Sequence, residues 1–213
     1  IPVPRFLIAV AAFSFGIYLI PGLWGAPLKP LSGILPPLTT QAYKIVEGGS
    51  MFYEDVSDDK RRYAEILEIP HGLKGYFIYE DALKASEESG KPVFVDFTGH
   101  SCANCRKMEE YVWVKPEVLK RLKNDFVIAS LYVDERKVLP EDEWYTNEDG
   151  DEIKTLGERN ADLQINTFNS NGQPYYYIVN SKGKILNIGG GYDPDETKFI
   201  DFLDKGKAKF EGL

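Results

Sequence analysis

The chain has 213 residues, which is long enough for one sizeable domain with additional segments. Its formal net charge of −8 argues against nucleic acid as a partner, because nucleic-acid binding requires basic patches. The sequence contains two cysteines, Cys102 and Cys105, in an otherwise ordinary globular composition. It is therefore not a disulfide-rich scaffold, and we expect the cysteine pair to be functional.

The N-terminal stretch is apolar. Residues 6–24 carry no charge, follow Arg5 and end in Trp24, which suits a membrane interface. This pattern predicts a transmembrane helix within residues 1–25, with Arg5 on the cytoplasmic side and the rest of the chain outside. A signal sequence and a buried core helix are the alternatives, although the stretch is longer than the apolar part of a signal sequence usually is.

A connector is predicted at residues 26–74. Four prolines lie between residues 27 and 37, and they indicate an extended, semi-rigid linker. The remainder of the connector, residues 43–73, has an irregular pattern from which we infer no function.

The organised domain is predicted at residues 75–213, where apolar runs alternate with segments of helical pattern. In chain order we expect a strand at 76–79, a helix at 81–89 between an Asp81 cap and Gly90, a strand at 93–97, a helix from Cys102 to about 112, a helical segment at 116–125, a strand at 126–133, an acidic surface insertion at 135–153, a helix at 157–168, a hairpin of strands at 175–179 and 185–189, and a closing helix at 194–205.

The motif Cys102-Ala103-Asn104-Cys105 stands where a buried strand is expected to lead into a helix. A cysteine at a helix N-terminus meets unpaired backbone N–H groups and the helix dipole, which stabilise a thiolate. Cys102 is therefore a candidate nucleophile. Cys105 lies within the first helical turn, so its sulfur can reach that of Cys102 and the pair can open and close as a disulfide.

Two acids are candidates for proton transfer at this pair. Asp96 interrupts an apolar strand, where an unpaired carboxylate is costly unless its pKa rises, and this makes it a plausible proton acceptor for the resolving thiol. The alternative is a core acid that simply has polar partners. Glu109 shares one helix face with both cysteines and could exchange protons with Cys105, or it could be an ordinary surface residue of a charged helix.

A metal site is the competing interpretation of the cysteine motif. His100, Cys102 and Cys105 form a compact cluster that could hold copper or zinc for delivery. A fourth ligand for a tetrahedral zinc site is missing from this cluster, which leaves copper(I) as the better candidate.

The predicted order of strands and helices is that of a thioredoxin-like α/β sandwich, in which a mixed sheet is flanked by helices. Two stretches, VFVDFTGHSCANCRKMEE at residues 93–110 and QPYYYIVNSKG at residues 173–183, strengthen this interpretation. Residues 75–210 resemble the C-terminal thioredoxin-like domain of the DsbD family of membrane thiol:disulfide interchange proteins. The N-terminal stretch looks like the final helix of that family's membrane domain.

The resemblance implies roles for individual residues. Cys102 matches the family's exposed nucleophile and Cys105 its resolving thiol, while Asp96 and Glu109 match acids that modulate the pKa of the buried cysteine. Gln173-Pro174 matches a cis X-Pro step beside the disulfide, where the backbone pairs with the incoming substrate.

The sequence departs from thioredoxin itself before the first cysteine. Thioredoxin commonly has Trp at the position that Ser101 occupies here, so its substrate surface does not transfer to this chain. The preceding His100 could contact substrate or lower the pKa of Cys102 when it is protonated, or it could be an exposed loop residue.

Together these features predict a membrane-tethered protein-disulfide reductase. The resemblance implies an inner-membrane protein with its C-terminal domain in the periplasm. Its expected partners are periplasmic thioredoxin-like or disulfide-containing proteins, and an adjoining membrane domain is expected to supply the electrons. The dithiol carries the electrons itself, so we expect no cofactor.

Overall fold

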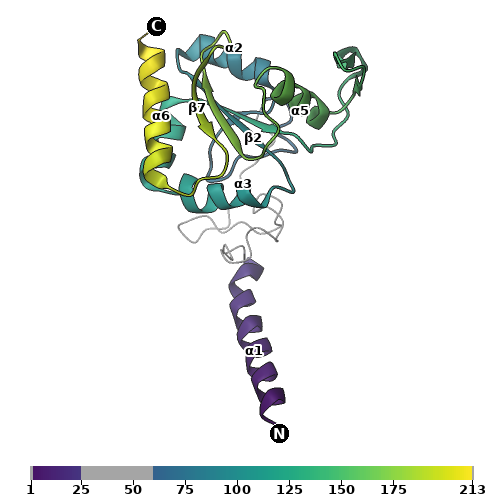
Figure 1. Ribbon diagram of the computed structural model, residues 1–213, viewed down its shortest axis with the longest axis vertical. Helices are drawn as coiled ribbons and strands as arrows, with labels where there is room; N and C mark the ends of the chain where they lie inside the picture. Colours follow the sequence, from purple (N-terminus) through teal and green to yellow (C-terminus); the bar gives the residue numbers. More distant parts are fainter. Residues whose placement is uncertain (1, 25–59, 213) are drawn as a thin grey trace. The chain divides into compact units, whose positions relative to one another are not determined.

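The computed structural model describes residues 2–24 and 60–212, and the chain divides into two compact units, Ile1–Asp55 and Val56–Leu213 (Figure 1). The first unit contains α1 (Val3–Leu19), which continues into the 3₁₀ helix η1 (Ile20–Trp24). The segment Val3–Gly22 is long and apolar enough to cross a membrane, and none of it is buried. It could be a membrane anchor or a signal sequence, whereas the core-helix alternative is not supported. The predicted linker residues 26–59 lie outside the described residues.

The second unit is built on a five-stranded mixed sheet with the strand order β1-β3-β2-β6-β7. The central strand β2 pairs in parallel with β3 and antiparallel with β6. The strands are β1 (Gly75–Tyr76), β2 (Val93–Thr98), β3 (Val127–Tyr132), β6 (Tyr175–Val179) and β7 (Ile185–Gly190). Every residue of β2 is buried, as its nearly continuous apolar run predicts for a strand covered on both faces.

Helices cover both faces of this sheet, with α3, α4 and α6 on one face and α2 and α5 on the other (Figure 1). They are α2 (Tyr79–Ser89), α3 (Ala103–Met108), α4 (Pro116–Asp125), α5 (Leu156–Asn166) and α6 (Glu196–Glu211), and a π-helical turn, η5 (Glu109–Trp113), continues α3. Side chains alternate along β2, so Phe94 packs in the core under α3, α4 and α6, whereas Val95 packs in the core under α2. The same alternation places Asp96 on the α3 face.

The element order and the parallel crossovers confirm the predicted thioredoxin-like α/β class. The predicted Asp81 cap is wrong. Ile78 is the N-cap residue of α2, and Asp81 lies in the first turn, where its carboxylate binds the Arg62 guanidinium. Gly90 ends this helix as predicted, with a φ of 65° that favours glycine.

The start of the packed domain lies before residue 75. The sequence pattern predicts a linker here, but four side chains of the segment are buried in the same core as Phe94: Ala64, Leu67, Ile69 and Leu73. Their spacing follows neither a helical nor a strand period, which is why the sequence pattern did not reveal their burial. The predicted end of the linker at residue 74 therefore falls within a single hydrophobic core, to which residues on both sides of it contribute.

The acidic insertion lies between β3 and α5. It contains the 3₁₀ turn η6 (Glu141–Glu143) and a two-stranded ribbon of β4 (Tyr145–Thr146) and β5 (Glu152–Ile153). A capping box then starts α5, because Thr155 accepts a hydrogen bond from the Glu158 backbone and the Glu158 carboxylate accepts one from the Thr155 backbone.

Candidate active site

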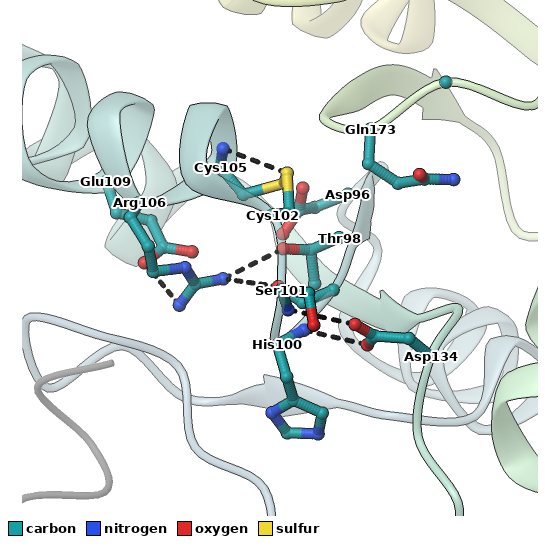
Figure 2. Close-up of a disulfide and its surroundings, with 12 residues drawn as sticks. Asp96, Thr98, His100, Ser101, Cys102, Cys105, Arg106, Glu109, Asp134 and Gln173 are labelled. Carbon is teal, nitrogen blue, oxygen red and sulfur yellow. Dashed lines mark hydrogen bonds and ion pairs between the residues drawn. A yellow bond between two sulfur atoms is a disulfide. The ribbon is translucent and has the colours of Figure 1, made fainter. Parts of the chain in front are cut away.

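A short loop carries the chain from β2 to α3, and Asp134 holds it in place. The Asp134 carboxylate accepts hydrogen bonds from the backbone N–H groups of His100 and Ser101, at 2.8 and 3.0 Å. Gly99 permits this approach, since a Cβ there would lie 3.0 Å from both Asp134 oxygens. The loop is therefore fixed by a residue that follows β3, and it presents Cys102 at the start of α3 (Figure 2).

The two cysteines form a disulfide and differ in exposure. Cys102 is the N-cap residue of α3, and its Sγ accepts a hydrogen bond from the Cys105 backbone N–H at 3.1 Å. Cys102 is half-buried, whereas Cys105 is only 1% exposed. The predicted placement of Cys102 at a helix N-terminus is confirmed.

Asp96 lies in the core beneath α3. In the strand register it stands opposite Ser130 on β3 and Tyr176 on β6, and the Ser130 hydroxyl donates a hydrogen bond to its carboxyl group at 3.3 Å. Burial raises the pKa of Asp96 to about 7, against the opposing effects of Arg106 and the Ser130 hydrogen bond. This carboxyl group therefore changes charge near neutral pH, as a proton acceptor must.

Glu109 is buried as well, so the interpretation of this residue as an ordinary surface acid is wrong. Its carboxylate pairs with the Arg106 guanidinium at 2.8 Å, and both side chains are less than a tenth exposed. Burial raises the pKa of Glu109 to about 8, while Arg106 acts in the opposite direction. The reason is tertiary, because the helix face that carries Glu109 packs onto the sheet.

Arg106 was not among the predicted site residues. Its guanidinium also reaches the C-terminal end of β2, where it donates hydrogen bonds to Thr98 Oγ1 at 3.1 Å and to the Gly99 carbonyl oxygen at 3.4 Å (Figure 2). In a charged helix an arginine usually suggests a solvated face. The available signal was its position directly after Cys105 and three residues before Glu109, which places cation and acid on neighbouring turns.

The Gln173–Pro174 peptide bond is cis, as the resemblance implied. Pro174 directly precedes β6, whose first residue pairs with Phe97 near the end of β2, so the cis bond and the cysteine loop share one edge of the sheet. The buried Gln164 of α5 supports this loop by donating to the Gly172 carbonyl at 2.8 Å and accepting from the Gln173 amide at 3.0 Å. Gln164 was missed because its partners follow the helix in a loop of irregular sequence.

His100 points away from the disulfide (Figure 2). Its Nε2 lies 2.7 Å from a Glu135 carboxylate oxygen, and its ring packs against Tyr132. The structure therefore does not bring His100 together with Cys102 and Cys105. Within residues 2–24 and 60–212, no group of three His, Cys, Asp or Glu side chains is arranged to hold a metal ion, so the delivery-module alternative has no structural support.

The fold and the cysteine pair define a class. A mixed α/β sandwich with a disulfide at the N-terminus of the helix after its central strand is a thioredoxin-like disulfide oxidoreductase fold. The family model of the thioredoxin-like domain matches residues 79–207, which is more than half of the chain, and the chain belongs to this family.

Other comparisons place the chain among distant neighbours. No curated protein matches it. A solved structure described as DsbH oxidoreductase is 18% identical with a TM-score of 0.48, covering 67% of this chain and 91% of its own. A thioredoxin from Thermus thermophilus is 22% identical with a TM-score of 0.44, over 62% and 85% of the two chains. A disulphide isomerase from Xylella fastidiosa Temecula1 is 18% identical with a TM-score of 0.43, over 65% and 97%.

Proposed function

We propose that the chain is a thiol:disulfide oxidoreductase that reduces disulfides of partner proteins. The observation that carries this proposal is the unequal exposure of the two bonded sulfurs. Half-buried Cys102 accepts a backbone N–H bond that also stabilises a thiolate, whereas Cys105 is covered. An accessible thiolate can attack a partner, and the covered thiol is kept for the second step.

The reaction begins from the reduced pair. The Cys102 thiolate attacks a sulfur of the partner's disulfide, and the other partner sulfur leaves as a thiolate. Cys105 then loses its proton and attacks Cys102 Sγ, so that the mixed disulfide breaks and the partner leaves with its second sulfur reduced. Two electrons have passed to the partner, and Cys102 and Cys105 end as the observed disulfide.

Asp96 and Glu109 are the proposed proton acceptors for Cys105. Both are buried on the α3 face, and their pKa values, raised by burial to about 7 and about 8, allow exchange near neutral pH. Gln173 and Pro174 are proposed to pair with substrate backbone at the cis bond, as in the DsbD family that the sequence resembles.

Attachment to a membrane is part of the proposal. The segment Val3–Gly22 supports an anchor by its length and apolar composition. The resemblance to the DsbD family supports an inner-membrane location with the thioredoxin-like domain in the periplasm. In that arrangement an adjoining membrane domain would reduce the disulfide again, and periplasmic thioredoxin-like proteins would be the partners.

The reduction potential of the Cys102–Cys105 couple tests this function. A reductant is expected to equilibrate in defined glutathione buffers at about −200 mV or below, toward the thioredoxin end of the scale. A potential near −120 mV, about that of a strong periplasmic oxidant, would reverse the proposed direction of electron flow. A pair that does not equilibrate with glutathione at all would contradict the assignment.

The matched control for this measurement is Cys105→Ala. It keeps the attacking Cys102 but lacks the resolving thiol, so it should accumulate a stable mixed disulfide with glutathione. Cys102→Ala should form none, because the remaining sulfur is covered. Mass spectrometry of the acid-quenched chain distinguishes the two results.

A further inference from the structure

A buried arginine accompanies the two buried acids of the site. Arg106 is 5% exposed, and Asp96 and Glu109 are 2% and 6% exposed. Arg106 joins the elements on which the acids lie, because it bonds Glu109 on the helical side and Thr98 and Gly99 at the end of β2. A surface role for this guanidinium is excluded by its burial.

The charge of the group follows from its members. Two ionised acids and one guanidinium carry a net charge of −1, and one proton makes the group neutral. Burying a charge is unfavourable, so the net charge of the group decides how readily it takes or gives a proton. Arg106 lowers the pKa of both acids, and the charge of Asp96 raises the pKa of Glu109.

Other polar and titratable groups surround Asp96, Arg106 and Glu109, while the Arg106 guanidinium stays paired with Glu109. Glu110 raises the pKa of Glu109. Burial and the two acids in turn raise the pKa values of the Tyr132 and Tyr176 hydroxyl groups, so both tyrosines stay neutral beside them. His71 Nε2 lies 2.7 Å from the backbone carbonyl oxygen of Glu109. His100 is directed to Glu135 instead. These neighbours come from β3, β6, the 60–74 segment and the π-helical turn, and the guanidinium is the permanent positive charge among them.

We propose that Arg106 is a positioning residue that sets the protonation of the Asp96–Glu109 pair, so that the pair can take up the proton released by Cys105. The inference rests on the proposed function, which requires Cys105 to resolve a mixed disulfide. In this step the Sγ–H bond of Cys105 breaks and its proton passes to a carboxylate of the pair. The Cys105 sulfur bonds to Cys102 Sγ, and the partner sulfur leaves with the electron pair of the broken S–S bond.

Arg106 matters because two buried acids without a cation would both stay protonated at neutral pH. A protonated pair cannot accept the Cys105 proton. With Arg106 present, one or both acids ionise and an acceptor exists at working pH. An opposite charge within a few ångströms moves a carboxyl pKa by about 1 to 3 units, which is enough to decide between the two states.

The test measures resolution of a glutathione mixed disulfide against pH. The full chain is reduced, mixed with oxidised glutathione, quenched with acid and followed by mass spectrometry, which separates the mixed disulfide from the Cys102–Cys105 disulfide. Arg106→Gln is expected to shift the midpoint of the pH–rate profile to higher pH by about 1 unit or more. Glu109→Gln should shift it to lower pH, because Asp96 then keeps the cation and loses a repelling acid.

The double variant Arg106→Gln with Glu109→Gln separates charge from structure. It removes one charge of each sign, so its midpoint should return toward that of the wild type, whereas purely structural damage would accumulate. Arg106→Lys should keep most of the wild-type profile because it keeps the charge. Circular dichroism checks that each variant is folded.

The outcomes distinguish the two proposals. A reduced wild-type chain that forms neither a mixed disulfide nor the Cys102–Cys105 disulfide with oxidised glutathione would overturn the proposed function and this inference with it. A normal wild-type reaction with an unshifted midpoint in Arg106→Gln would overturn the inference alone. If Arg106→Gln does not fold, Glu109→Gln decides, since a midpoint that fails to move to lower pH contradicts the proposed charge balance.

Discussion

Asp96 occupies the middle of a strand in which every residue is buried, and its carboxyl group is stable there mainly in the protonated form. In the unfolded chain this group ionises at its ordinary pKa of 3.8, whereas in the folded chain it ionises only near pH 7. The folded state therefore binds a proton that the unfolded state has lost between these values. The stabilisation from this proton is complete below about pH 4 and disappears as the pH rises to about 7.

Asp96→Asn should remove this pH dependence. The amide has the shape of the acid but no proton to lose, so at pH 8 the variant is expected to exceed the wild type in free energy of unfolding by roughly 2 to 4 kcal/mol. Below pH 4 the two should be equal. Urea unfolding of the oxidised chain at several pH values measures this, with the exposed Asp149→Asn as control. A constant difference at all pH values would show that packing, not ionisation, separates the variants.

At the scale of elements, the position of the helix that carries the cysteine pair depends on a neighbouring strand. The loop before Cys102 has no regular structure of its own, and the carboxylate that follows β3 holds its backbone. The helix N-terminus, which stabilises the thiolate, is thus oriented by the β2–β3 pairing. Asp134 therefore fixes the position of Cys102, the proposed nucleophile.

Asp134→Ala is expected to loosen the loop. Loss of two charge-assisted hydrogen bonds should lower the free energy of unfolding by about 1 to 3 kcal/mol, and alkylation of reduced Cys102 near pH 6 should slow as its thiolate fraction falls. Asp134→Asn keeps one acceptor oxygen, so its free energy of unfolding and its alkylation rate should lie between those of the wild type and those of Asp134→Ala. Wild-type alkylation kinetics in the alanine variant would mean that α3 alone positions Cys102.

At the scale of the whole molecule, residues 60–74, which precede the first strand, belong to the thioredoxin-like domain. It contributes Leu67 and Ile69 to the core, and it also reaches the site region. Tyr132, which packs against His100, donates to the Glu68 carbonyl at 3.2 Å, and His71 bonds the carbonyl oxygen of Glu109 at 2.7 Å. Truncation here should therefore damage both packing and the site.

Two fragments test this expectation. A chain from residue 56 retains the segment, and a chain from residue 75 lacks four buried side chains. The shorter fragment is expected to be less stable by at least about 3 kcal/mol in urea unfolding, because losing even one buried leucine or isoleucine side chain commonly costs 2 to 5 kcal/mol. Leu67→Ala in the longer fragment should reproduce part of the loss. Equal unfolding midpoints for the two fragments would contradict the assignment of this segment to the core.

Much of the fold follows from local sequence. Apolar runs, the Gly90 stop and the turn residues between elements act within a few positions, so the order of strands and helices after residue 75 was predictable. The residues at which individual helices and strands begin and end were less predictable. The cap of α2 was misplaced because an apolar residue, Ile78, takes the N-cap position for reasons of core packing rather than capping chemistry.

By itself the sequence determined the α/β class, the apolar N-terminal helix and the place of the cysteines at a strand-to-helix junction, since each depends on short-range pattern. Only the tertiary structure decided which polar side chains meet at that junction. Arg106 and Glu109 are buried because α3 packs onto the sheet, and His100 turns to Glu135 because the β3 end lies beside its loop. Burial in a packed interior, which no local pattern encodes, is what converts charged residues of a helix into a group that can exchange a proton.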